Sequence, residues 1–189
     1  MKKSAVFIDR DGTINEEKNY LFRIEDWEWI HGSIDAIKSF NDAGILVIII
    51  SNQAGVARGK FSEQDIVNLH SFVNKELSVY GARIDAFYYC PHHPEFGKIR
   101  NCNCRKPLPG LIMEAQKDFN IDLENSYMIG DKISDIQAGE AAGLTSIMVL
   151  TGYGTQEYNQ YSSKVICFKN LFTASRYILN SNTLIKIKY

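Results

Sequence analysis

The chain has 189 residues, 45% of them hydrophobic, and a formal net charge of −1 at pH 7. This length favours one domain over residues 1–189 with one sizeable core, and the balanced charge argues against a nucleic-acid or membrane partner. The apolar run at 45–50 is far too short to cross a bilayer, and the N-terminus lacks the apolar stretch of a signal peptide. We therefore expect a cytoplasmic protein.

Strand and helix patterns alternate along the chain. Unbroken apolar runs predict strands at 4–8, 45–50, 84–89, 126–130, 145–150 and 163–168. Apolar residues at helical spacing predict helices between Ser33 and Gly44 and at about 63–80, 109–119 and 133–142. Ser33 and Ser62 are the expected N-caps of the first two helices, and residues 180–189 look like a poorly constrained tail.

Strands that alternate with helices predict an α/β fold, a Rossmann-like three-layer sandwich around a parallel sheet. Ligands of such sheets bind beyond the carboxyl ends of the strands. Four residues with reactive or polar side chains directly follow predicted strands, namely Asp9, Ser51, Cys90 and Asp131. We expect them to meet along one rim of the sheet.

Asp9 and Asp11 open this rim in the stretch "VFIDRDGTIN". Two carboxylates so close together repel each other unless a cation or a proton intervenes. Mg²⁺ suits them, because it prefers oxygen ligands and is commonly held by few carboxylates together with phosphate. A solvated turn is the alternative for the aspartate pair taken alone.

The other rim residues supply groups that bind phosphate. Ser51 offers a hydroxyl and Asn52 an amide, while Arg105 and Lys106 offer two cations before a proline. Asp131 adds a third carboxylate. Each group taken alone also fits a turn, a surface charge pair or a helix cap, so the argument depends on their combination.

The order of these groups resembles the haloacid dehalogenase superfamily of phosphotransferases, over most of the chain to about residue 155. "DRDGT" is similar to its first motif, Ser51 matches the second, Lys106 the third and "GDKISD" the fourth. The resemblance implies that Asp9 is the nucleophile and that Asp11 is the general acid and then the base. It also implies that Ser51 and Lys106 bind the phosphoryl group, and that Asp9, the Asp11 carbonyl and Asp131 hold Mg²⁺.

A second informative stretch is a loop at about 90–106, "CPHHPEFGKIRNCNCRK". Cys90, His92, Cys102 and Cys104 could fill the tetrahedral shell of a Zn²⁺ ion and leave no open position, so this zinc would be structural. His93 is the competing imidazole, and free cysteines in a loop are the alternative. The loop runs directly into the two cations, which a zinc cage would help to hold in place.

Five segments together resemble the family of D-glycero-D-manno-heptose 1,7-bisphosphate 7-phosphatases: "DRDGTIN", "SNQAGVARGKF", "YYCPHHPE", "CNCRKP" and "MIGDKISDIQA". The resemblance implies a fold without a large cap domain. It implies that the enzyme hydrolyses the C7 phosphate of the sugar bisphosphate and leaves heptose 1-phosphate for nucleotide-heptose biosynthesis. Arg105 would recognise the retained phosphate or the sugar, Lys132 would contact phosphate near the nucleophile, and the 17–20 loop with Tyr20 would contact substrate.

Three alternatives remain open on the sequence. Histidinol-phosphate phosphatases resemble this architecture and share a zinc loop, although Arg105 beside Lys106 better suits a doubly anionic substrate. A non-catalytic, zinc-stabilised binding module would not need Asp9 or Asp11. A nucleic-acid 3′-phosphatase would need a basic groove, which the charge balance disfavours. We expect a monomer, and the sequence assigns neither a role to Asp135 nor an anomer preference.

Overall fold

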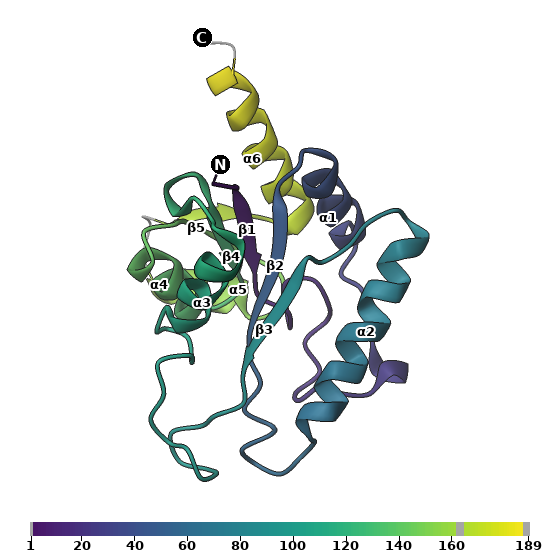
Figure 1. The fold of residues 1–189 in the computed structure, drawn as a ribbon, viewed down its shortest axis with the longest axis vertical. Helices are drawn as coiled ribbons and strands as arrows, with labels where there is room; N and C mark the ends of the chain where they lie inside the picture. The colour runs from purple at the N-terminus through teal and green to yellow at the C-terminus, as the bar shows by residue number, and fades with distance from the viewer. Residues whose placement is uncertain (1, 162–164, 187–189) are drawn as a thin grey trace.

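The computed structural model describes residues 2–161 and 165–186. Six strands form one fully parallel sheet in the order β3-β2-β1-β4-β5-β6 (Figure 1). The strands are β1 (Ala5–Ile8), β2 (Leu46–Asn52), β3 (Ala86–Cys90), β4 (Tyr127–Gly130), β5 (Thr145–Val149) and β6 (Ile166–Phe168). The predicted α/β class and parallel sheet are therefore confirmed.

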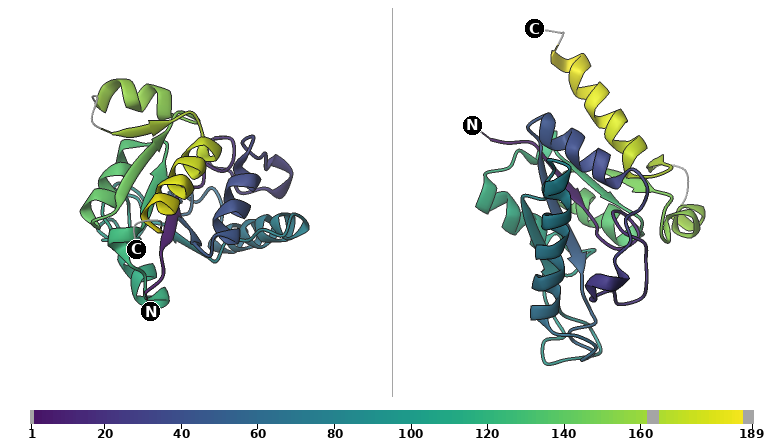
Figure 2. Two further views of the ribbon diagram at one scale, coloured as in Figure 1. Left: turned by 90° about the horizontal axis from the view of Figure 1, so that it is seen from above. Right: turned by 90° about the vertical axis from the view of Figure 1, so that its right-hand side faces the viewer.

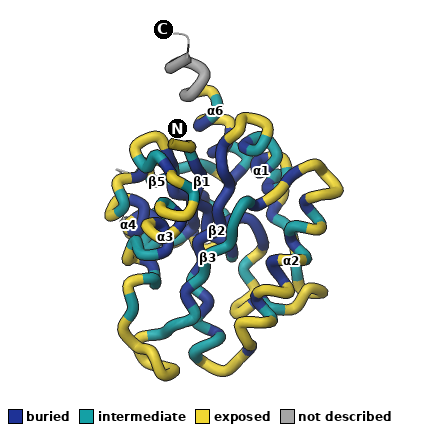
Figure 3. Tube along the Cα trace, in the orientation of Figure 1, coloured by how far each residue is buried: buried dark blue, intermediate teal, exposed yellow. Residues whose placement is uncertain are grey.

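Helices cover both faces of the sheet. They are α1 (Ser33–Asp42), α2 (Glu63–Val79), α3 (Gly110–Phe119), α4 (Ile133–Ala141), α5 (Gly154–Tyr161) and α6 (Leu171–Lys186). The apolar sides of α1, α2 and α6 pack on one face, and those of α3 and α4 pack on the other. Figure 3 shows the buried central strands between these layers. Among the described residues, no helix combines the length and the apolar character that crossing a membrane requires.

β1 lies inside the sheet with a partner on each side, so its end is held firmly. Val6 pairs with Val47 of β2 and with Tyr127 of β4. The ladder continues past the strand, because the Asp9 N–H donates to the Ile129 carbonyl at 2.9 Å. A rigid sheet therefore fixes the backbone of the first aspartate.

Some element ends differ from the sequence prediction. Ser62 caps α2 in a capping box with Asp65, as predicted. The prediction that Ser33 caps α1 is wrong, because Gly32, with φ of 84°, takes the cap position and Ser33 is the first helical residue. Two helices, α5 and α6, were not expected, and α6 runs to Lys186 inside the stretch predicted as a tail. The first two residues of the strand predicted at 163–168 lie outside the described residues.

The loops at the carboxyl ends of the strands shape the molecule beyond the sheet. The 53–62 and 91–109 segments extend together past the sheet, at the lower end of Figure 1, while α6 projects from the opposite end (Figure 2). In the described part of the chain no cap domain is inserted between the strands. Loops alone therefore frame the rim where the predicted site residues lie.

Candidate active site

A cavity of about 320 Å³ opens at the carboxyl ends of the strands. Loops after β1, β2, β4 and β5, together with the segment before α3, contribute its lining. Six predicted site residues line it: Asp9, Asp11, Tyr20, Asn52, Lys106 and Lys132. Ser51, Arg105 and Asp131 are not among its lining residues. Of the four residues expected to meet at the rim, Asp9 lines this cavity, together with five other predicted site residues.

Lys106 connects two carboxylates at the floor of the cavity. Its Nζ lies 2.7 Å from Asp9 Oδ1 and 2.6 Å from Asp135 Oδ1, and it donates to the Ile50 carbonyl at 2.8 Å. Burial alone would lower the pKa of this lysine, but the two carboxylates raise it overall. A fixed positive charge therefore lies against Asp9, and Asp135, whose role the sequence left open, helps to hold it there.

Three buried carboxylates lie close together beside the cavity, and their negative charges repel one another. Asp9, Asp131 and Asp135 offer oxygen atoms that all lie within 4.8 Å of one another. Burial, followed by the negative charges of Asp9 and Asp135, raises the pKa of Asp131 to about 8. One of its oxygens accepts from the Tyr153 N–H at 2.8 Å, and the other is buried with no hydrogen-bond partner among the described residues. This oxygen-only cluster fits a hard divalent cation, which would relieve the repulsion.

Asp11 lies in a different environment from Asp9. Arg10 approaches its carboxylate edge-on, with Nη2 2.9 and 2.8 Å from the two oxygens. Asn15 donates to Oδ1 at 3.0 Å and Gln53 to Oδ2 at 3.1 Å. Burial alone would raise the pKa of Asp11, but the Arg10 charge and these hydrogen bonds lower it overall. The second aspartate is thus held by donors and stands outside the carboxylate cluster.

The end of β2 connects these groups. The Asn52 side chain makes reciprocal hydrogen bonds with the Lys106 backbone, both of 3.1 Å. Ser51 is buried, and its hydroxyl lies 3.3 Å from Gln53 Nε2. Asn52 therefore positions the lysine segment, in addition to lining the cavity where we expected it to bind substrate.

One wall of the cavity is the loop after β1. Lys132 Nζ lies 3.2 Å from Glu17 Oε2 and 4.7 Å from the ring of Tyr153. Asn19 and Tyr20 both have positive φ, of 49° and 72°. This tight bend turns the predicted substrate loop toward the cavity.

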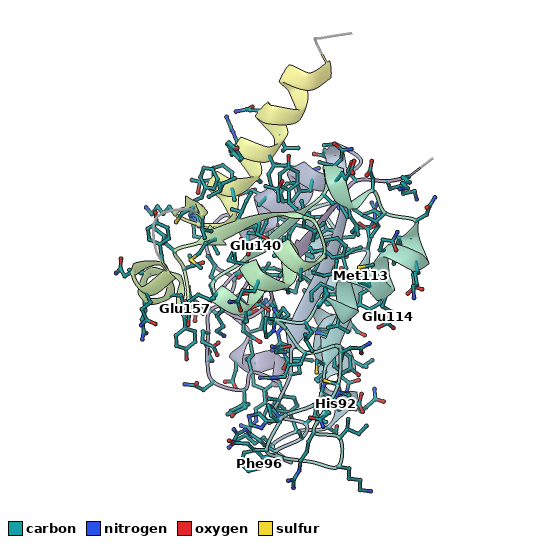
Figure 4. The ribbon with its side chains drawn as sticks, turned by 90° about the vertical axis from the view of Figure 1, so that its left-hand side faces the viewer. His92, Phe96, Met113, Glu114, Glu140 and Glu157 are labelled. Carbon is teal, nitrogen blue, oxygen red and sulfur yellow. The ribbon has the colours of Figure 1, made fainter. Side chains whose placement is uncertain are left out.

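The four predicted zinc ligands meet in space. Cys104 Sγ lies 3.2 Å from Cys90 Sγ and 3.3 Å from His92 Nδ1, and Cys90 Sγ lies 3.7 Å from both Cys102 Sγ and His92 Nδ1. A tetrahedral zinc shell would separate its sulfur ligands by about 3.8 Å and sulfur from nitrogen by about 3.5 Å. The cluster therefore fits Zn²⁺ with all four positions filled. Figure 4 shows His92 in the loop region, below Met113 and Glu114 of α3.

Neighbouring residues of this loop serve other contacts. His93 lies outside the cysteine cluster and pairs with Arg58, 3.0 Å from its Nη2. Arg58 also stacks over Phe96, with its guanidinium carbon 4.0 Å from the ring centroid. Arg105 donates from Nη1 to the His92 carbonyl at 3.1 Å. The geometry therefore places His92 in the cysteine cluster and His93 outside it.

Sequence reasoning missed the residues that surround Asp11. Arg10 is fully buried, and Asn15 and Gln53 are the other side chains that donate hydrogen bonds to the Asp11 carboxylate. The position of Arg10 between two aspartates was a signal in the sequence that it could pair with one of them. Its burial was not predictable, because it depends on tertiary packing that the spacing of residues does not show.

Comparison with known proteins agrees with this geometry. A family model described as HAD-hydrolase-like matches residues 103–169. A D-glycero-beta-D-manno-heptose-1,7-bisphosphate 7-phosphatase of Haemophilus ducreyi is 46% identical over 156 residues, covering 80% of this chain and 86% of that protein. The D-glycero-alpha-D-manno-heptose-1,7-bisphosphate 7-phosphatase of Photorhabdus laumondii is 42% identical over 182 residues, covering 94% and 97%.

A solved structure is also similar over nearly the whole chain. It is the D,D-heptose 1,7-bisphosphate phosphatase of B. bronchiseptica in complex with magnesium and phosphate. The TM-score is 0.87 at 29% identity, with coverage of 94% of this chain and 99% of that one. The chain belongs to the D-glycero-D-manno-heptose-1,7-bisphosphate 7-phosphatase family of the haloacid dehalogenase superfamily.

Proposed function

We propose that this chain hydrolyses the C7 phosphate of D-glycero-D-manno-heptose 1,7-bisphosphate, with Asp9 as nucleophile and Asp11 as general acid and base. One observation carries this division of roles. Asp9 lies 2.7 Å from Lys106 in the carboxylate cluster, whereas Asp11, two residues on, is held outside it. The first carboxylate is thus held against a cation that can attract phosphate, and the second lies apart from that cation and is oriented by its own hydrogen-bond donors.

The chemistry takes two steps. An Asp9 oxygen attacks phosphorus, the bond from phosphorus to the C7 oxygen breaks, and Asp11 gives its proton to that oxygen. Water then attacks the aspartyl-phosphate, Asp11 takes a proton from this water, and the bond from phosphorus to Asp9 breaks. A bound phosphate dianion would push the Asp11 carboxyl toward its protonated form before the first step, because like charges repel.

Lys106 and Lys132 would bind the transferring phosphoryl group, with the Ser51 hydroxyl as a further donor. Asp9, Asp131 and the Asp11 carbonyl would hold Mg²⁺, which supplies electrostatic stabilisation of the phosphoryl oxygens when bound. The buried Asp131 oxygen without a partner supports this assignment.

The substrate assignment is supported by the relatives and by the cavity. Both are consistent with a small polar ligand, and the 17–20 loop with Tyr20 would contact the sugar. Arg105, which directly precedes the cavity-lining Lys106, would recognise the retained phosphate or the sugar. The product, heptose 1-phosphate, would enter nucleotide-heptose biosynthesis in the cytoplasm. Relatives named for the α and for the β anomer match at similar identity, so kinetics on both anomers would decide the route.

Steady-state kinetics with Mg²⁺ on heptose 1,7-bisphosphate and histidinol phosphate tests the substrate assignment. We expect kcat/KM to be at least about 10²-fold higher for the sugar bisphosphate, because Arg105 adds a second anion contact. Faster cleavage of histidinol phosphate would contradict the assignment. We also propose a monomer, for which sedimentation should give a mass near 21.5 kDa.

A further inference from the structure

Arg10 is the largest side chain that is fully buried in the described part of the chain. A buried guanidinium is costly unless its charge and its N–H groups are matched. Asp11 matches the charge: Nε lies 3.2 Å from both of its oxygens, and Nη2 lies 2.9 and 2.8 Å from them, while Nη1 is buried with no hydrogen-bond partner among the described residues. Two nitrogens of one planar group, each shared between both oxygens, hold the carboxylate in place.

The same guanidinium also reaches the wall of the cavity. Nη2 donates to the Leu21 carbonyl at 2.9 Å, directly after the bend at Asn19 and Tyr20. Tyr20 lines the cavity. One planar group therefore connects the Asp11 carboxylate with the end of the loop that would contact substrate.

The surroundings of Arg10 preserve this pairing. His70 of α2 is buried and stacked on Phe87, with ring centroids 4.1 Å apart. Burial, and then the nearby charge of Arg10, lower the pKa of His70 to about 3, although Asp11 opposes the shift. The imidazole is therefore neutral and adds no second cation that would compete for the carboxylate.

We propose that Arg10 is a positioning residue that orients the Asp11 carboxyl for proton transfer to the leaving oxygen. Its hydrogen bond to the Leu21 carbonyl couples this orientation to the position of the 17–20 loop. It acts through Asp11 and touches no reacting atom. This inference rests on the role proposed for Asp11. In the first step the proton moves from the Asp11 carboxyl to the departing oxygen, so Arg10 matters most when that oxygen is a poor leaving group.

Arg10→Lys separates this role from a merely structural one. Lysine keeps the charge but has a single nitrogen, so it cannot place two nitrogens against the carboxylate and also reach the Leu21 carbonyl as Arg10 does. We expect kcat/KM for heptose 1,7-bisphosphate to fall about 10²-fold, within the range of general acid catalysis. The loss for 4-nitrophenyl phosphate should be at least about tenfold smaller, because nitrophenolate leaves without a proton. The inhibition constant of inorganic phosphate should stay within about threefold, since the phosphate site is intact.

A double-mutant cycle with Asp11→Asn provides the decisive comparison. In that background Arg10→Lys should slow the sugar reaction by less than about threefold, because the group through which it acts is gone. The same loss with and without Asp11, or equal losses for both substrates, would overturn the inference. If Asp11→Asn itself shows no preference between the two leaving groups, the role proposed for Asp11 fails first, and the inference fails with it.

Folding is checked by thermal unfolding of each variant. If Arg10→Lys does not fold, Arg10→Gln replaces it, because the amide of glutamine can still donate a hydrogen bond to the Asp11 carboxylate. Arg83→Lys is the matched control. Arg83 also pairs with a nearby carboxylate, Asp85 at 2.9 Å, but on the surface, and its substitution should leave both substrates' kcat/KM unchanged.

Discussion

At the scale of single residues, two aspartates with the same chemistry are made different by their partners. Asp9 faces Lys106 and the other carboxylates, and Asp11 faces Arg10 and two amides. The motif predicted which residues would be reactive. It could not predict what separates them, because the donors to Asp11 come from positions as distant as Gln53 and meet it only in the fold.

Asp9→Asn tests the nucleophile. An amide oxygen is a poor nucleophile toward phosphate, so phosphate release should fall by a factor on the order of 10⁴ or more. Thermal unfolding should show no loss of stability, since one of three repelling charges is removed. Asp42→Asn is the control, because Asp42 pairs with Lys38 on the surface of α1 and should be dispensable. Turnover close to that of the unsubstituted enzyme would refute the assignment.

At the scale of elements, the sequence predicted the ends of the inner strands to within two residues. Continuous runs of β-branched residues are typical of parallel strands that are buried on both faces of a sheet. It missed α5, a short and polar segment, and α6, whose Leu171, Ala174 and Ile178 face the core at helical spacing. The zinc ligands were predictable from their residue types. The hydrogen bonds between the Asn52 side chain and the Lys106 backbone were not predictable, because they join residues 54 positions apart.

Cys104→Ser tests the zinc loop. One tightly bound zinc per chain is expected in the unsubstituted protein, and this variant should lose it together with much of its activity, because Cys104 directly precedes Arg105 and Lys106. Cys167→Ser is the matched control, since Cys167 lies on β6 outside the cluster. The measurements are the zinc content and the kcat/KM of both variants, compared with those of the unsubstituted protein. Absence of zinc from protein purified without chelators would contradict the assignment.

The packing of α2 against β3 predicts a pH dependence of stability. Because the pKa of His70 is about 3 in the fold and the ordinary pKa of histidine is 6.5, the unfolded chain binds more protons between these pH values. Stability from this residue is therefore present above pH 6.5 and lost as the pH falls toward 3. Between pH 7 and pH 4, His70→Phe should lose less stability than the unsubstituted protein, by on the order of 3 kcal/mol. Urea unfolding over this range measures it, and parallel curves would show that the buried imidazole contributes nothing.

At the scale of the whole molecule, the parallel sheet makes the site possible. It brings the ends of β1, β2, β4 and β5 to one rim, and loops rather than a cap domain form the cavity walls. The zinc loop and the 53–62 segment extend side by side beyond that rim. The carboxylates proposed to be catalytic therefore lie at the ends of rigid strands, and under this proposal the loops would set specificity.

The central claim is removal of the C7 phosphate, and ³¹P NMR of the reaction tests it most directly. With Mg²⁺ and heptose 1,7-bisphosphate, the signal of the primary C7 phosphate should disappear while one equivalent of inorganic phosphate appears. The signal of the anomeric 1-phosphate should persist. Loss of the 1-phosphate signal first, or of both signals at similar rates, would contradict the account.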